Sequence, residues 1–118
     1  MAACQGPGPY QPTPTPRPPL VVRAWVEYPV ARMGNVQTFY VQVSDPEGRT
    51  LKGVNVIGEV NSQYGRVSLT FPVTDSSGQT RFKEAIPTAT AGTLFEVRVL
   101  AFVNNDTGEV YTSYTVWP

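Results

Sequence analysis

Short stretches in which apolar and polar residues alternate follow one another along most of the chain. Alternation with a period of two is typical of strands that bury one face, and no segment shows the 3.6-residue period of a helix. Clusters of Gly, Asn, Asp and Pro separate these stretches at intervals of about ten residues and indicate turns. The pattern predicts seven strands, over residues 21–28, 36–44, 54–60, 67–73, around Phe82, 93–103 and 109–117.

Seven short strands in this spacing predict an all-β fold, an antiparallel β-sandwich in which each sheet has one wet face. The clearest alternation predicts an inward row formed by Val67, Leu69, Phe71 and Val73. Polar residues that fall between apolar positions, Gln37 among them, are expected to face solvent. In the last hairpin, Gly108 is expected to supply the positive φ that such turns often need.

The first residues differ in composition from the rest of the chain. Seven of the twelve prolines lie within residues 7–19, where Arg17 is the only charged side chain. Pro-x-Pro spacing favours an extended polyproline II chain, and fifteen such residues span roughly 45 Å at about 3.1 Å each. We therefore expect a disordered Pro/Thr-rich tether at residues 1–19 and one β-sandwich domain at residues 20–118.

Composition narrows the possible functions. The chain has nine basic and nine acidic side chains, no histidine and a single cysteine. A neutral chain without a basic cluster in its sequence is expected to bind neither nucleic acid nor an anionic membrane through charge. Histidine is the usual general base near neutral pH and a common zinc ligand, so its absence predicts a protein that is not an enzyme. One cysteine excludes an internal disulfide.

Two segments resemble bacterial immunoglobulin-like domains. Residues 34–56 combine a valine-alternating strand, an Asp-x-x-Gly turn and a small residue ahead of a second valine pair, and residues 74–82 contain a Thr-Asp-x-x-Gly turn followed by a short strand. The resemblance implies a seven-stranded immunoglobulin-like sandwich over residues 20–118. Macroglobulin-type and transthyretin-like domains use the same turns. The cysteine pair and core tryptophan of antibody domains are missing, which excludes the antibody type.

The residues before Cys4 resemble the end of a bacterial lipoprotein signal, in which small residues precede a lipid-modified cysteine. In such signals an apolar segment precedes the cysteine, and the sequence begins too close to Cys4 to contain one. The resemblance implies that Cys4 carries a lipid anchor, that the membrane is a partner of the chain, and that the domain is extracytoplasmic, at the bacterial cell surface. The alternative is an incidental cysteine in the tail.

Acidic residues occupy three of the predicted turns. They are Asp45, Glu47, Asp75 and Asp106. In a sandwich of this strand order the three turns lie at one pole, and oxygen ligands from several loops are what calcium requires. Aspartate in a β-turn more often bonds its own backbone. The alternatives are therefore a calcium site and three structural turns.

Three residues are candidates for contact with a partner. Trp25 is out of phase with the apolar positions of the first predicted strand, so it is expected on an outer face. Three alternative roles fit that position: stacking on a sugar ring, anchoring a protein partner, or packing across strands. The strand order places the N-terminus at the pole of the acidic turns. An anchored chain would then turn the opposite pole, with Met33 and Tyr64, away from the membrane.

Together these features predict a non-catalytic extracytoplasmic lipoprotein domain that binds a protein or glycan, or acts as a structural or adhesion module. The alternative is a transthyretin-like carrier or regulatory domain that binds a small ligand or calcium at the acidic loops. No cofactor other than calcium is expected.

Overall fold

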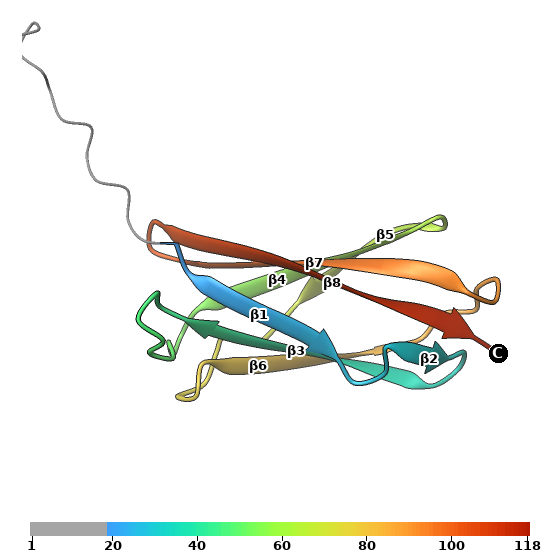
Figure 1. The fold of residues 1–118 in the computed structure, drawn as a ribbon, viewed down its shortest axis with the longest axis horizontal. Coiled ribbons are helices and arrows are strands. Elements are labelled where there is room, and N and C mark those ends of the chain that lie inside the picture. The colour runs from blue at the N-terminus through green and yellow to red at the C-terminus, as the bar shows by residue number, and fades with distance from the viewer. Residues whose placement is uncertain (1–18) are drawn as a thin grey trace, which may run out of the picture.

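The described part of the chain consists of strands, turns and loops. The computed structural model describes residues 19–118, so Cys4 and nearly all of the predicted tether lie outside the described residues. Two sheets pack against each other (Figure 1). The strands are β1 (Val21–Val26), β2 (Val30–Arg32), β3 (Val36–Ser44), β4 (Asn55–Ser62), β5 (Gly65–Thr70), β6 (Gln79–Ala85), β7 (Thr93–Val103) and β8 (Asp106–Trp117). The predicted all-β architecture is confirmed.

The described chain has eight strands, not seven, and one pairing is parallel. The three-stranded sheet has the order β1-β3-β6, and the five-stranded sheet has the order β2-β8-β7-β4-β5. The additional strand, β2, runs parallel to β8 with Val30 opposite Thr115, so the prediction of a purely antiparallel fold is wrong. The sequence prediction missed β2 because a strand of three residues is too short to show alternation.

Gln37 stabilises the point where the chain crosses from one sheet to the other, between β1 and β2. It is completely buried, and its side chain accepts the N–H of Tyr28 at 2.9 Å and donates to the carbonyl of Tyr28 at 2.8 Å. The expectation that Gln37 faces solvent is wrong because it is in phase with the buried Phe39 and Val41. The two hydrogen bonds satisfy an amide that would otherwise be costly to bury.

The core lies between the two sheets. Its buried apolar residues include Val22, Val26, Phe39, Val41, Val43, Val54, Val56, Val60, Leu69, Phe71, Phe95, Val97, Val99, Ala101, Tyr114 and Val116. Two members of the predicted inward row are exposed instead, Val67 to 51% and Val73 to 55%. Val67 lies on the edge strand β5 at the end next to the β4–β5 turn, whereas Leu69 on the same face of this strand is covered. Val73 lies beyond the end of β5, in the loop that leads to β6.

The hairpin between β7 and β8 differs from the expectation for Gly108. Asn104 takes the positive φ of the turn, at 53°, and Gly108 lies within β8. A Cβ atom at Gly108 would be 2.4 Å from the carbonyl oxygen of Leu20. The glycine is therefore required by the close approach of the entering chain, which also donates the Leu20 N–H to Thr107 at 3.0 Å.

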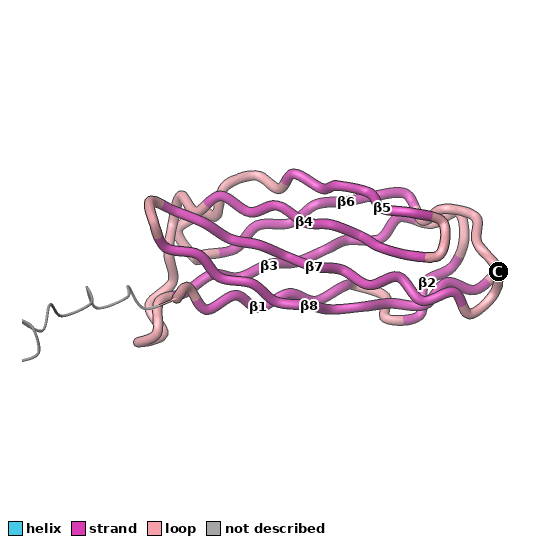
Figure 2. Tube along the Cα trace, turned by 90° about the horizontal axis from the view of Figure 1, so that it is seen from above, coloured by secondary structure: helices cyan, strands magenta, loops and turns pink. Residues whose placement is uncertain are grey.

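The loops gather at the two ends of an elongated sandwich (Figures 1 and 2). One end, the entry pole, contains Leu20, the connections at residues 45–54 and 71–78, and the β7–β8 turn. The other end, the far pole, contains the connections at residues 27–29, 33–35, 63–64 and 86–92, together with the C-terminus. The three turns with acidic residues thus share the pole at which the described chain begins.

Candidate functional site

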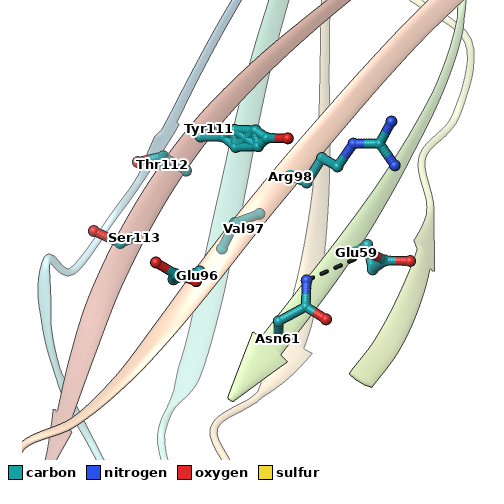
Figure 3. Close-up of a pocket in the computed structure, with 8 residues that line it drawn as sticks. All are labelled: Glu59, Asn61, Glu96, Val97, Arg98, Tyr111, Thr112 and Ser113. Carbon is teal, nitrogen blue, oxygen red and sulfur yellow. Dashed lines mark hydrogen bonds between the residues drawn. The ribbon is translucent and has the colours of Figure 1, made fainter. Parts of the chain in front are cut away.

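A shallow hollow of about 540 Å³ lies on the outer face of the five-stranded sheet (Figure 3). Three neighbouring strands, β4, β7 and β8, build it, and their pairing arranges the outward side chains in two rows. We call this site the polar hollow; its rows are Asn61, Glu96 and Ser113, and Glu59, Arg98 and Tyr111.

Ion pairs hold several of these side chains in place. Arg98 Nε donates to the carboxylate of Glu109, and this contact raises the pKa of the Arg98 guanidinium. Arg66 Nη1 lies 3.6 Å from Glu59 Oε2, and Arg66 Nε donates to Asn61 Oδ1 at 3.2 Å. These side chains are therefore oriented before any ligand arrives, which lowers the entropic cost of ordering them on binding.

Two members of the polar hollow are open to a ligand. Glu96 forms no ion pair within residues 19–118, and Tyr111 is 62% exposed. A carboxylate accepts hydrogen bonds, and an exposed tyrosine ring offers an apolar face with a polar tip. The hollow thus combines fixed polar groups with one planar apolar surface.

Sequence alternation correctly placed Glu59, Glu96 and Arg98 outside the core, but it did not bring them together. Glu96 and Arg98 lie two residues apart on β7, and only the pairing of β4 with β7 brings Glu59 opposite Arg98. The pairing of β7 with β8 then adds Tyr111 and Ser113. No local motif carries this information.

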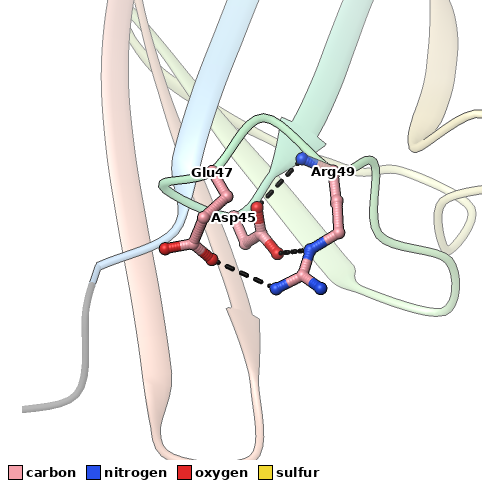
Figure 4. Close-up of polar contacts among 3 residues, drawn as sticks. All are labelled: Asp45, Glu47 and Arg49. Carbon is pink, nitrogen blue, oxygen red and sulfur yellow. Dashed lines mark hydrogen bonds and ion pairs between the residues drawn. The ribbon is translucent and has the colours of Figure 1, made fainter.

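Asp45 and Glu47 both contact Arg49 in the turn after β3 (Figure 4). Asp45 Oδ1 accepts the backbone N–H of Arg49 at 2.9 Å, and Oδ2 accepts Arg49 Nε at 2.9 Å. Arg49 Nη2 donates to Glu47 Oε1 at 3.1 Å. The backbone N–H of Arg49, followed by its guanidinium, lowers the pKa of Asp45. These are the contacts of a structural turn.

Asp75 has the same kind of role. Its Oδ1 accepts the N–H groups of Ser77 at 2.8 Å and of Gln79 at 3.0 Å. The turn interpretation is therefore confirmed for Asp45 and Asp75, while Asp106 begins β8. Residues 19–118 contain no group of three or more acidic, cysteine or histidine side chains arranged around a possible metal position. The calcium site stays a prediction.

Trp25 lies on the outer face of the three-stranded sheet, as its phase predicts, and is 41% exposed. It is directly opposite Tyr40 on β3, and the two rings stack with centroids 5.6 Å apart and planes inclined by 15°. Cross-strand packing, one of the three expected roles of Trp25, is thus confirmed. The stack leaves part of the indole accessible.

Met33 and Tyr64 both lie at the far pole, but they differ in exposure. Met33 is half-buried against the core, and its N–H donates to the carbonyl of Trp117 at 2.9 Å. Tyr64 is 57% exposed, and its hydroxyl contacts Thr90. The predicted separation of these residues from the acidic turns agrees with the arrangement of the loops in Figure 1.

Comparison with known proteins finds no matching family model and no curated protein of similar sequence. In the part of the chain that the structure describes, no helix is long and apolar enough to cross a membrane.

Proposed function

We propose that this chain is a non-catalytic, immunoglobulin-like binding module whose polar hollow binds a neutral oligosaccharide. The observation that carries the proposal is the polar hollow itself, in which fixed planar polar groups adjoin an exposed tyrosine ring. Sugars present hydroxyl groups around the ring and C–H groups on its faces. Carboxylate, amide and guanidinium groups bind the hydroxyls, and an aromatic ring packs on the C–H face.

The charges of the polar hollow favour a neutral ligand. Arg98 is paired with Glu109 and Arg66 with Glu59, so Glu96 is left with an uncompensated negative charge. An acidic glycan would be repelled by that carboxylate, whereas neutral hydroxyl groups donate hydrogen bonds to it.

The immunoglobulin-like assignment and the anchor belong to the same proposal. The turns of residues 34–56 and 74–82, and two packed sheets joined by a crossing between β1 and β2, support the assignment. Ala2-Ala3-Cys4, followed by the proline-rich segment, supports an extracytoplasmic module with a lipid on Cys4. An anchored sugar-binding domain would act in adhesion or in retention of surface glycan.

The ligand is tested by amide NMR titration of the full chain with hexasaccharides derived from cellulose, chitin, starch and mannan. We expect at least one of them to shift amides of β4, β7 and β8. Glu96→Ala should weaken that binding by about tenfold or more, because a hydrogen bond to a charged group contributes about 1.5–3 kcal/mol. Tyr111→Ala should weaken it by about three- to tenfold, because ring stacking contributes about 0.5–1.5 kcal/mol.

Matched controls come from outside the polar hollow. Glu27→Ala and Tyr64→Ala remove the same side-chain types elsewhere, and both should leave the titration unchanged. Shifts confined to other strands, or equal losses in the control variants, would contradict the proposal, as would the absence of shifts with all four sugars.

The anchor is tested separately in cells that carry the natural gene at its own locus. We expect the protein to partition into the detergent phase and to incorporate a labelled fatty acid, and Cys4→Ser to abolish both. A chain that stays in the aqueous phase with Cys4 intact would exclude the anchor and leave the sugar proposal standing.

A calcium titration followed by amide NMR separates this proposal from the carrier alternative. Shifts at Asp45, Asp75 and Asp106 with millimolar calcium would favour a regulatory site at the entry pole. We expect the carboxylates of Asp45 and Asp75 to keep their turn contacts instead.

A further inference from the structure

The outer face of the three-stranded sheet gathers cations that are far apart in the sequence. Strand pairing places Trp25 opposite Tyr40 and Tyr40 opposite Arg81, in one row across the sheet. Arg23 lies in the next row, opposite Gln42, and Lys83 is two residues from Arg81 on β6, or about 7 Å along the strand. We call Arg23, Trp25, Tyr40, Arg81 and Lys83 the basic face.

The cations of the basic face outnumber the acidic side chains on the same face. Arg23, Arg81 and Lys83 are exposed and form no ion pair within residues 19–118. One acidic residue, Glu27, lies on this face just after β1. Its N–H donates to the carbonyl of Thr38, which is opposite Lys83, so Glu27 and Lys83 share a row. The basic face therefore carries a net positive charge in a chain whose overall charge is zero.

The other surfaces differ in charge. The outer face of the five-stranded sheet has as many acidic as basic side chains, namely Glu59, Glu96 and Glu109 against Arg32, Arg66 and Arg98. Of these arginines, Arg66 and Arg98 are ion-paired. The connections of the entry pole carry more acidic than basic side chains, namely Asp45, Glu47 and Asp75 against Arg49 and Lys52. An anionic surface would thus attract the basic face and repel the entry pole.

We propose that the basic face docks on an anionic phospholipid bilayer. The inference rests on the proposed anchor at Cys4, since three cations bind such a surface weakly by themselves and a lipid chain supplements them. Tryptophan and tyrosine suit the boundary between headgroups and acyl chains because each has an apolar body and a polar tip. Trp25 and Tyr40 lie among the cations and would contact that boundary.

The chain enters the domain at the edge of this same sheet. β1 begins at Val21 and forms one side of the basic face, and Cys4 lies fifteen positions before Pro19. A lipid on Cys4 therefore raises the local concentration of the basic face at the membrane. Docking lays the sandwich on its three-stranded sheet and turns the polar hollow, on the opposite sheet, away from the bilayer. This orientation replaces the one in which the entry pole faces the membrane.

The two tryptophans allow a direct test. Cys4, the single cysteine, is coupled to a maleimide lipid in vesicles of phosphatidylglycerol and phosphatidylcholine, so the test does not depend on cellular lipidation. In Trp117→Phe, where Trp25 is the remaining tryptophan, brominated lipids should quench the fluorescence. In Trp25→Phe, where Trp117 remains at the far pole, they should not. Pure phosphatidylcholine vesicles, or high salt, should abolish the quenching of Trp25.

Charge variants make the test specific. Each cation near an anionic surface contributes about a fivefold change in binding, so Arg81→Gln with Lys83→Gln should lower the ratio of docked to undocked protein by about 30-fold. Arg32→Gln with Lys52→Gln removes two cations outside the basic face and should change the ratio little. Far-ultraviolet circular dichroism confirms that each variant is folded.

Three outcomes would overturn the proposal. The first is unquenched Trp25 in anionic vesicles, and the second is equal quenching of Trp25 and Trp117. The third is displacement of β1 and β6 amide signals by a soluble acidic polysaccharide, polygalacturonate, while vesicles leave them unshifted. Because the lipid is attached chemically, failure of this test leaves the cellular anchor to be judged by the Cys4→Ser experiment.

Discussion

Tyr64 ties two connections of the far pole together. Its hydroxyl oxygen accepts the Thr90 N–H at 2.9 Å and lies 2.8 Å from the Thr90 hydroxyl. The Thr90 hydroxyl, and then its N–H, stabilise the tyrosinate and lower the pKa of Tyr64 from 10.0 to about 8. Tyr114 behaves in the opposite way, because burial, and then the nearby charge of Glu84, raise its pKa to about 12.

This contrast predicts that one tyrosine of the folded chain ionises at a lower pH than an ordinary tyrosine does. The pKa of Tyr64 is about 8 in the folded chain and 10.0 in the unfolded chain, so ionisation of Tyr64 stabilises the fold. This contribution to stability is complete above pH 10, declines as the pH falls, and is absent below about pH 8. The ultraviolet absorbance of tyrosinate should therefore show one residue ionising near pH 8. Tyr64→Phe should remove this step, and Tyr28→Phe should not. A titration without any step below pH 9 or so would exclude the strong Thr90 contact.

At the scale of single residues, phase along a strand was a good guide to exposure but not to partners. It placed Trp25 outside and Phe39 and Val41 inside. It did not predict that Tyr64 bonds Thr90, since the two residues are brought together by separate connections at one pole. For Gln37, the polarity of the side chain predicts exposure, whereas its phase with Phe39 and Val41 places it in the core.

At the scale of the elements, the Gln37 side chain on β3 holds the connection between β1 and β2. β1 pairs in the three-stranded sheet and β2 in the five-stranded sheet, and Tyr28 between them has its N–H and carbonyl bound by the Gln37 side chain. The backbone of Tyr28 thus obtains from a side chain the two hydrogen bonds that it no longer obtains from a neighbouring strand.

Gln37→Leu should consequently destabilise the fold by about 2 kcal/mol, because it leaves Tyr28 with two backbone groups whose partners are lost. The free energy of unfolding from urea titration measures the effect. Gln42→Leu changes the same side chain at a half-buried position of the same strand and should cost less than about 0.5 kcal/mol. Similar losses in both variants would mean that the crossing does not depend on Gln37.

For the molecule as a whole, coverage of one sheet by the other decides which apolar positions are buried. Val99 lies on β7 near the middle of the five-stranded sheet and is 1% exposed, whereas Val67 lies on its edge strand, next to the β4–β5 turn, and is 51% exposed. Alternation alone makes the two valines equivalent, and only coverage by the opposite sheet distinguishes them.

Val99→Ala should therefore lower the free energy of unfolding by about 1–3 kcal/mol, through lost burial and an unfilled cavity. Val67→Ala, the same chemical change, should lower it by less than about 0.5 kcal/mol. Urea unfolding of the two variants under identical conditions compares them. Equal losses would show that the open side next to β5 is covered in solution.

The amino-acid sequence by itself determined that the domain is built of strands, where most of them lie and which turns join them. Alternation and turn composition are local properties, so they can be read without knowledge of the pairing. The sequence pattern does not predict the parallel strand β2, because three residues are too few to show alternation. Strand order, register and the coverage of one sheet by the other depend on contacts between distant segments, and the tertiary structure decided them. The same contacts gather Arg23, Arg81 and Lys83 on one face, and Glu59, Glu96 and Arg98 on the other. A chain whose sequence has neither a basic cluster nor a binding motif thereby acquires two chemically different surfaces.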